Sequence, residues 1–404
     1  MKRTISLFII IFLLLNLLTG CWNRRELNEL AITVAMAVDK SDEGYVVSTQ
    51  VVTPGQVAAK QGGGQKSPVT LYQEKGDTVF EAIRRMTTGT ARKLYFPHLR
   101  VLVISEELAE EGIGETLDFL SRDHELRTDF YIIIAKNTKA ENVLKVTTGL
   151  EDIPANKLFS SLESSEKAWA PSMTVTLDEL TADIVSEGIH PNLTGVHVIG
   201  ENKKAGEMME NVQEIEADVK LKYGGMAVFK DDKLIGWLDE RESKGVNYVL
   251  GKVKSTIGEV SCPEGNGKVG VEVIRTKADL KGKVEDGSPK GTIEIKLEGN
   301  VGDVQCKKLD LTKTKTIDEL EKKSEKKLKE IIESTITTAQ EDFKLDLFGF
   351  GEAIHRSNPD YWKKAKKDWD EKFTDMPIEV KVDVQIRRLG TIGNSPLEKI
   401  EGGD

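Results

Sequence analysis

The sequence predicts a mixed α+β protein of several domains. Three patterns indicate this class: short apolar runs typical of strands, intervening stretches with helical spacing, and a final segment in which apolar and polar residues alternate. In the first half, apolar runs at 31–38, 99–104 and 130–135 alternate with helical stretches, an order typical of α/β layers. In the second half, predicted strands are followed by long amphipathic helices, so we expect a sheet packed against helices.

The first half begins with a predicted hairpin. The apolar runs 31–38 and 45–52 are joined by the turn sequence 41–44. Asp77 is then a candidate N-cap for a helix. The apolar residues at helical spacing that define this helix are Val79, Phe80, Ile83 and Met86. A capping box at 176–179 predicts the start of a later helix.

The second half contains two predicted helices with clear start signals. A second capping box at 316–319 opens the longest one, whose lysine-rich side we expect to face water, with a membrane-headgroup contact as the alternative. Asn358 and Pro359 open the other. Its apolar stripe predicts domain core rather than a ligand cage, and consists of Trp362, Ala365, Trp369 and Phe373. Residues 378–386 then alternate as a half-buried strand does.

The first 21 residues carry the clearest functional signal. Lys2 and Arg3 precede an apolar run at 5–18, which is shorter than the roughly 20 residues that span a bilayer and is typical of a secretory signal. The following Leu18-Thr19-Gly20-Cys21 resembles the bacterial lipobox, which predicts lipid on Cys21 and cleavage before it. The alternative is an uncleaved anchor with an incidental cysteine. Two or three acyl chains would hold the protein durably, since each buried methylene contributes roughly 0.8 kcal/mol.

We expect the chain to divide at a charged, glycine-containing segment, 201–218. The expected parts are a signal peptide at 1–20, an N-terminal α/β region at 21–200, a linker at 201–218, a C-terminal α+β domain at 219–392 and a disordered tail at 393–404.

Charge and cysteine content exclude some functions. With 57 basic and 67 acidic residues, the formal net charge is −10, which argues against binding to nucleic acid. Export would permit a disulfide between Cys262 and Cys306. We nevertheless expect two unpaired thiols, because a domain of this size does not need a covalent link.

The sequence contains no recognisable catalytic constellation. None of the five histidines lies in an H-E-x-x-H motif, and no two are spaced i, i+4. His190 and His197 flank a predicted turn and strand, which leaves a shared metal ion as an alternative. The paired acidic residues at 231–232 and 239–240 are typical of hairpin turns, which explains them without acid–base catalysis. We therefore expect no catalytic, cofactor-binding or metal site, and favour a binding or assembly role.

Four segments carry a more specific resemblance. They are 21–39, which starts Cys-Trp-Asn-Arg-Arg-Glu-Leu; 96–100 together with 120–123; 225–230 together with 236–238; and 348–351 continued through Pro359, Trp362 and Trp369 to the closing strand. Taken in order, they resemble the Ger(x)C family, the C subunits of spore germinant receptors. Asn23 stands where aspartate is expected.

The resemblance implies a three-domain α/β fold, with two subdomains in 21–200 and one in the second half. It also implies a partnership with two multi-spanning membrane subunits, A and B, with lipid on Cys21 holding the chain on the outer face of the spore inner membrane. The family supplies no catalytic residues. Two other functions remain open: a solute-binding lipoprotein that captures a small molecule for a membrane transporter, and a cell-wall hydrolase.

Overall fold

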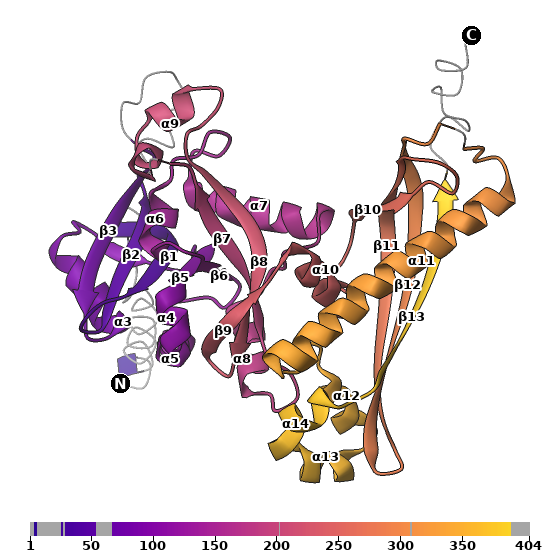
Figure 1. The fold of residues 1–404 in the computed structure, drawn as a ribbon. Coiled ribbons are helices and arrows are strands. Elements are labelled where there is room, and N and C mark those ends of the chain that lie inside the picture. The colour runs from indigo at the N-terminus through magenta and orange to yellow at the C-terminus, as the bar shows by residue number, and fades with distance from the viewer. Residues whose placement is uncertain are drawn as a thin grey trace.

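The computed structural model describes residues 4–5, 26, 29–53, 67–201, 203–307 and 309–388. They form two β-sheets with helices packed against them, which confirms the mixed α+β class (Figure 1). Cys21, the tail 393–404 and the signal segment 1–20, apart from Thr4 and Ile5, lie outside the described residues.

The first sheet has nine strands in the order β3-β2-β1-β5-β6-β7-β8-β9, with β4 paired to the start of β1. Its parallel centre is β1, β5, β6 and β7, and antiparallel strands close both edges. The strands are β1 (Leu30–Lys40), β2 (Tyr45–Val52), β3 (Val69–Gly76), β4 (Lys93–Tyr95), β5 (Val101–Ser105), β6 (Tyr131–Ala135), β7 (Asn192–Ile199), β8 (Lys220–Lys230) and β9 (Lys233–Leu238). The two subdomains expected within 21–200 share this one sheet.

Helices cover both faces of the first sheet because successive side chains of its central strands point to opposite sides. Met36 and Val38 belong to a core shared with α3, α4, α5 and α8, whereas Ala35 and Ala37 pack in a second core with α6 and α7. The helices are α3 (Val79–Arg85), α4 (Glu106–Glu111), α5 (Gly114–Arg122), α6 (Ala140–Lys145), α7 (Pro154–Ala168), α8 (Leu177–Val185) and α10 (Glu240–Val249).

The predicted hairpin is confirmed. Lys40 pairs with Tyr45, and the Ser41 N–H donates to the Gly44 carbonyl over 3.0 Å. Gly44 has a φ of +83°, and a Cβ there would lie 2.4 Å from the Gly76 carbonyl oxygen. Only glycine fits this turn without displacing its neighbours.

Helix caps were predicted with mixed success. The capping box at 176–179 is confirmed. The N-cap of α3 is Thr78, whose hydroxyl accepts the Glu81 N–H. The predicted cap, Asp77, is therefore wrong and lies one residue too early. Asp239 caps α10 instead of lying in a hairpin turn, whereas Asp231 does occupy the β8–β9 turn.

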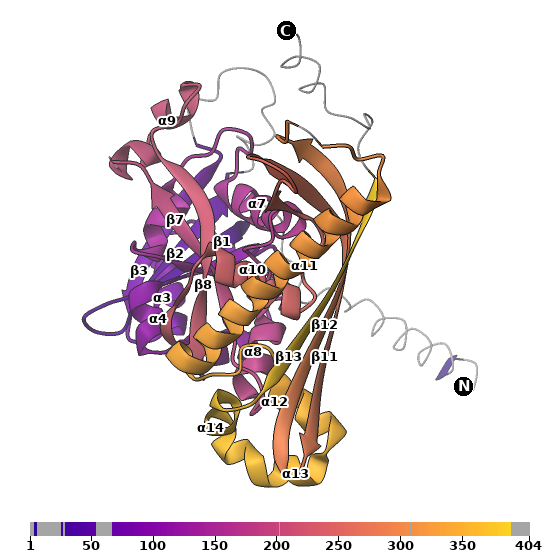
Figure 2. The ribbon, with the colours of Figure 1, turned by 45° about the vertical axis from the view of Figure 1, so that its right-hand side comes forward.

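The second sheet has the order β10-β11-β12-β13, and α11 runs diagonally across it (Figure 2). Its strands are β10 (Thr256–Ser261), β11 (Lys268–Glu285), β12 (Ser288–Val304) and β13 (Ile378–Arg388). Helix α11 spans Thr314–Thr337 and begins after Lys313 without a side-chain cap, so the capping box predicted at 316–319 is wrong. Its buried side is Leu320, Leu328, Ile332, Thr335 and Ile336.

Two glutamates of α11 cover the free edge of this sheet. The Glu321 Oε1 atom accepts the Ile386 N–H over 2.8 Å, and Glu325 Oε1 accepts the Val384 N–H over 3.2 Å. Both amides belong to β13, the edge strand, so the carboxylates occupy donors that another strand could otherwise bind.

Cys262 and Cys306 form a disulfide, so the expectation of two unpaired thiols is wrong. Their Cα atoms lie 5.7 Å apart although the residues are separated by 44 positions. Both cysteines lie just beyond strands that flank β11: Cys262 directly follows β10, which ends at Ser261, and Cys306 lies two residues after β12, which ends at Val304. The sheet order therefore brings them together, and sequence spacing does not reveal that order.

A buried carboxylate orders the loop that follows α11. Asp346 is fully buried, and its two oxygens accept four N–H groups. The donors are the Phe348, Gly349 and Gly351 amides, at 3.0, 2.9 and 2.8 Å, and Trp369 Nε1 at 3.0 Å. The short helices beyond are α12 (Phe350–Ser357), α13 (Pro359–Ala365) and α14 (Trp369–Thr374). The stripe of Trp362, Ala365, Trp369 and Phe373 is buried, which confirms it as core.

The two sheets are joined by a continuous core. The segment 201–218 contains a short 3₁₀ turn, Lys203–Glu207, and α9 (Glu210–Gln213). Beyond it, β8 and β9 return to the first sheet, and the core of that sheet continues into residues of β11 and β12. The boundary expected at 201–218 stays a prediction.

Candidate functional site: a cleft between α3 and α5

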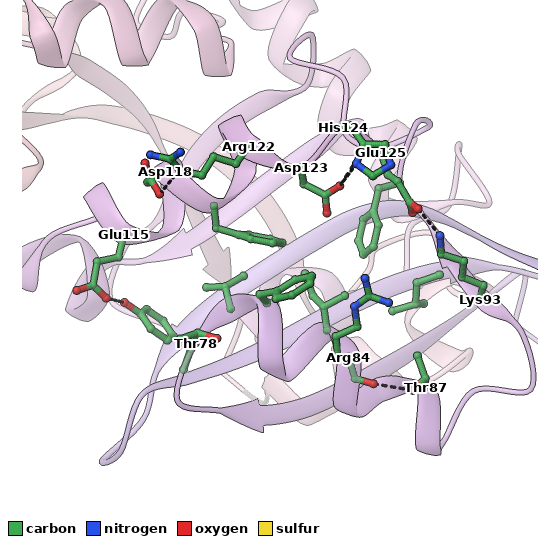
Figure 3. A pocket seen from close by; sticks show the side chains of 17 residues that line it. Thr78, Arg84, Thr87, Lys93, Glu115, Asp118, Arg122, Asp123, His124 and Glu125 are labelled. Atoms are coloured by element: carbon green, nitrogen blue, oxygen red, sulfur yellow. Dashed lines mark hydrogen bonds and ion pairs between the residues drawn. The ribbon is translucent and has the colours of Figure 1, made fainter.

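A cleft of about 580 Å³ lies beside the first sheet (Figure 3). Helices α3 and α5 form its walls, and β4 closes one side. The lining residues are Tyr45, Thr78, Val79, Phe80, Ile83, Arg84, Thr87, Lys93, Leu94, Phe96, Glu115, Asp118, Phe119, Arg122, Asp123, His124 and Glu125. A cavity of 300–1,000 Å³ is the usual size of a small-molecule site.

The inner surface of the cleft is apolar. Val79, Leu94 and Phe96 are buried, whereas Phe80 is 45 % exposed. The rings of Phe80 and Phe119 lie 5.4 Å apart between centroids. Phe80 is one of the apolar residues whose spacing predicted α3, but it is not buried with Val79 and Ile83, and its ring faces α5 across the cleft.

Most charged groups at the rim are already paired. Arg122 Nε lies 2.8 Å from Asp118 Oδ2, which lowers the pKa of that carboxyl, and Lys93 pairs with Glu125. At the other end, the Tyr45 hydroxyl donates to Glu115 over 2.7 Å. Burial first, and this hydrogen bond second, raise the pKa of Tyr45 to about 12, so the phenol stays protonated at neutral pH.

Arg84 differs from the other cations of the rim. Its guanidinium lies over the Phe80 ring, 4.9 Å from the centroid. In the part of the chain that the structure describes, no carboxylate lies within ion-pair distance of it. Figure 3 shows the guanidinium pointing from α3 into the cleft, opposite Asp123.

The cleft lies beside the start of β1. Lys93 and Leu94 line the cleft and pair in parallel register with Leu30 and Ala31. Leu30 is the first residue of β1, so the cleft borders the point where the described chain enters the first sheet.

The histidines singled out in the sequence have separate partners. His190 Nε2 lies 2.9 Å from Asp370 Oδ1, and His197 Nε2 lies 3.1 Å from the Gly224 carbonyl oxygen. In the described ranges, no three His, Cys, Asp or Glu side chains are grouped as a metal site would require. Across the same ranges, no helix is both long and apolar enough to span a membrane.

Sequence reasoning did not find the cleft. Its residues come from four segments between 45 and 125 that only the folded sheet brings together. One signal was present, because two of the segments quoted for the family resemblance, 96–100 and 120–123, supply Phe96, Arg122 and Asp123.

The fold and the cleft define a class of protein: a mixed α+β chain with two sheets, one continuous core between them and an open apolar cleft against the first sheet. Comparison with known proteins is more specific. The family described as "Spore germination protein N-terminal domain" matches residues 23–198, and "Spore germination B3/ GerAC like, C-terminal" matches residues 224–390. The chain therefore belongs to this spore germination family, as the Ger(x)C resemblance predicted.

Individual relatives agree along the whole chain. It is 33 % identical over 405 residues to spore germination protein KC of Bacillus subtilis (strain 168), with 98 % of each chain covered. Spore germination protein B3 of the same organism is 24 % identical, covering 97 % of this chain and all of the relative. The crystal structure of the GerBC protein superposes with a TM-score of 0.53 at 20 % identity. That match covers 87 % of this chain and 96 % of the other, which shows a shared fold.

Proposed function

We propose that this chain is a lipid-anchored, non-enzymatic subunit of a nutrient germinant receptor, required for spores to germinate in response to small nutrients. The family match to both halves of the chain, in order and nearly end to end, carries the proposal. The relatives KC and B3 are themselves named as spore germination proteins. Two multi-spanning subunits, A and B, complete the receptor.

The tether is Cys21, within Leu18-Thr19-Gly20-Cys21. Leu30 lies nine positions after Cys21, so the extended connection reaches at most about 30 Å. Lipid at this position would keep the first sheet close to the outer face of the spore inner membrane, where membrane-spanning partners can contact it. Several acyl chains give durable anchoring, whereas one gives only reversible binding.

Replacing the lipidated residue tests the anchor. In Cys21→Ala spores, we expect the protein to be lost from the membrane fraction and the nutrient response to disappear. A second chain that carries Cys21→Ala behind an added transmembrane helix controls for folding, and should restore membrane retention. Membrane retention together with a normal nutrient response in Cys21→Ala spores would contradict the proposed tether.

Co-purification tests the partnership. Spore membranes solubilised in mild detergent and captured through a tag on this chain should yield two polytopic proteins in comparable amounts. Their absence, under conditions where the tagged chain is itself recovered intact, would contradict receptor membership. An assay on purified peptidoglycan separates this proposal from a cell-wall hydrolase, which would release soluble fragments.

A further inference from the structure

We propose that the cleft between α3 and α5 is a binding site for a small molecule with an apolar body and a carboxylate group. The proposal goes beyond receptor membership, because it gives this chain a ligand of its own. The juxtaposition that carries it is a pair of accessible aromatic rings beside an arginine that has no carboxylate partner among the described residues.

The aromatic pair supplies the apolar contact. Phe80 is 45 % exposed, and Phe119 is only partly buried. Their rings continue the apolar surface formed by Ile83, Leu94 and Phe96. A ligand ring or branched chain on this surface would bury area that is now in water, which is favourable in proportion to the apolar area removed.

Arg84 supplies the polar anchor. Its guanidinium lies against the Phe80 ring, so a bound ligand that covers the ring would also bring its own charged group beside the cation. A guanidinium pairs with a carboxylate through two parallel hydrogen bonds, and this geometry selects a planar anion. The pairing strengthens when the ligand excludes water from the aromatic surface.

The acidic residues of the rim do not oppose such an anion strongly. Asp118 is paired with Arg122, and Glu125 with Lys93. The carboxylate of Asp123, across the cleft from Arg84, accepts the Glu125 N–H over 2.9 Å and lies 3.9 Å from His124 Nδ1. Arg84 is thus the cation of the lining that remains available for an incoming carboxylate.

Calorimetry on the full chain, reconstituted in phosphatidylcholine nanodiscs, tests the proposal with 3-phenylpropionate as the probe. We expect a Kd on the order of 1 mM or tighter, since a ligand of this size gains little affinity per atom. The alcohol analogue 3-phenylpropanol lacks the anion, and propionate lacks the ring. Each should bind at least about tenfold more weakly.

Two neighbouring arginines provide a matched pair of variants. Arg84→Gln should weaken binding of 3-phenylpropionate about tenfold or more, and Arg84→Lys should restore part of it. Arg85→Gln removes the same charge one position along α3, where the guanidinium pairs with Glu81 at 2.7 Å, and should leave binding unchanged. Because Arg84 and Arg85 are both exposed, none of these variants should alter the melting temperature.

Three results would overturn the proposal. The first is no binding of 3-phenylpropionate at about 10 mM, which would be expected if the cleft holds only a segment of a partner protein. The second is equal binding of the alcohol, and the third is equal loss in Arg84→Gln and Arg85→Gln. None of them bears on receptor membership, which the Cys21 and co-purification experiments test separately.

Discussion

The buried carboxylate of Asp346 offers a sharp test of how the second half of the chain is held together. Each of its oxygens accepts two N–H groups: Phe348 and Gly349 on Oδ1, Gly351 and Trp369 on Oδ2. In Asp346→Asn one oxygen becomes an NH₂ group. Whichever way the amide is oriented, two buried donors then lose their acceptor and face another donor.

The expected cost follows from those two donors. An unsatisfied buried hydrogen-bonding group costs about 1–3 kcal/mol, so Asp346→Asn should destabilise the protein by about 2–6 kcal/mol. In domains of 150–250 residues, 1 kcal/mol corresponds to about 2–4 °C, so the melting temperature should fall by several degrees to about 20 °C. The matched control is Asp342→Asn, which makes the same change at an exposed position four residues earlier.

Thermal unfolding followed by near-ultraviolet circular dichroism is the assay, because it reports on the buried tryptophans of this region. A double-mutant cycle adds specificity. Trp369→Phe removes one of the two donors on Oδ2, so the cost of Asp346→Asn in that background should be smaller by about 1 kcal/mol. A melting temperature for Asp346→Asn within about 2 °C of the Asp342→Asn control would refute the reasoning.

Three further predictions concern the C-terminal region. Replacing both Cys262 and Cys306 by serine should lower the free energy of unfolding by about 4 kcal/mol, from the 44-residue separation, and reducing agent should then have no effect on the variant. The double variant Glu321→Ala and Glu325→Ala frees two amides of the edge strand, so sedimentation velocity should show more self-association; unchanged sedimentation would contradict the capping role. Burial raises the pKa of Asp370, but its bonds to His190 and Lys230 outweigh that effect and lower it. The stabilisation is therefore present above the unfolded pKa of about 3.9 and is lost as pH falls through the lower folded value, so wild type and Asp370→Asn should converge in stability only in acid.

Local sequence signals predicted the elements whose structure depends on neighbouring residues. The hairpin at 31–52 and the strand at 378–386 follow from alternation and turn chemistry alone. Asn358 and Pro359 start α13 as expected, because an Asn cap and a proline at the first helical position act within a few residues.

Features that depend on sheet order could not be predicted in this way. The disulfide requires that β10 and β12 flank the same strand, and the cleft requires that Phe80 and Phe119, separated by 39 positions, meet on one face of the first sheet. The start of α11 was misplaced for a different reason. Thr316 and Glu319 have the right spacing for a capping box, but the residues before them are equally compatible with a helix, which begins at Thr314.

The segments that identified the family have two separate structural roles. Two of those in the first half, 96–100 and 120–123, border the cleft. Those of the second half lie where the two halves of the chain meet. A Cβ on Gly351 would lie 2.5 Å from the Gly188 Cα atom, and one on Gly236 would lie 2.7 Å from the Phe343 ring. Position 351 needs glycine because the two backbones approach too closely for a side chain, and position 236 needs it because the Phe343 ring occupies the space that a Cβ would take. Changes in the first group should therefore alter what the cleft can bind, whereas changes in the second group alter how the two sheets are held together.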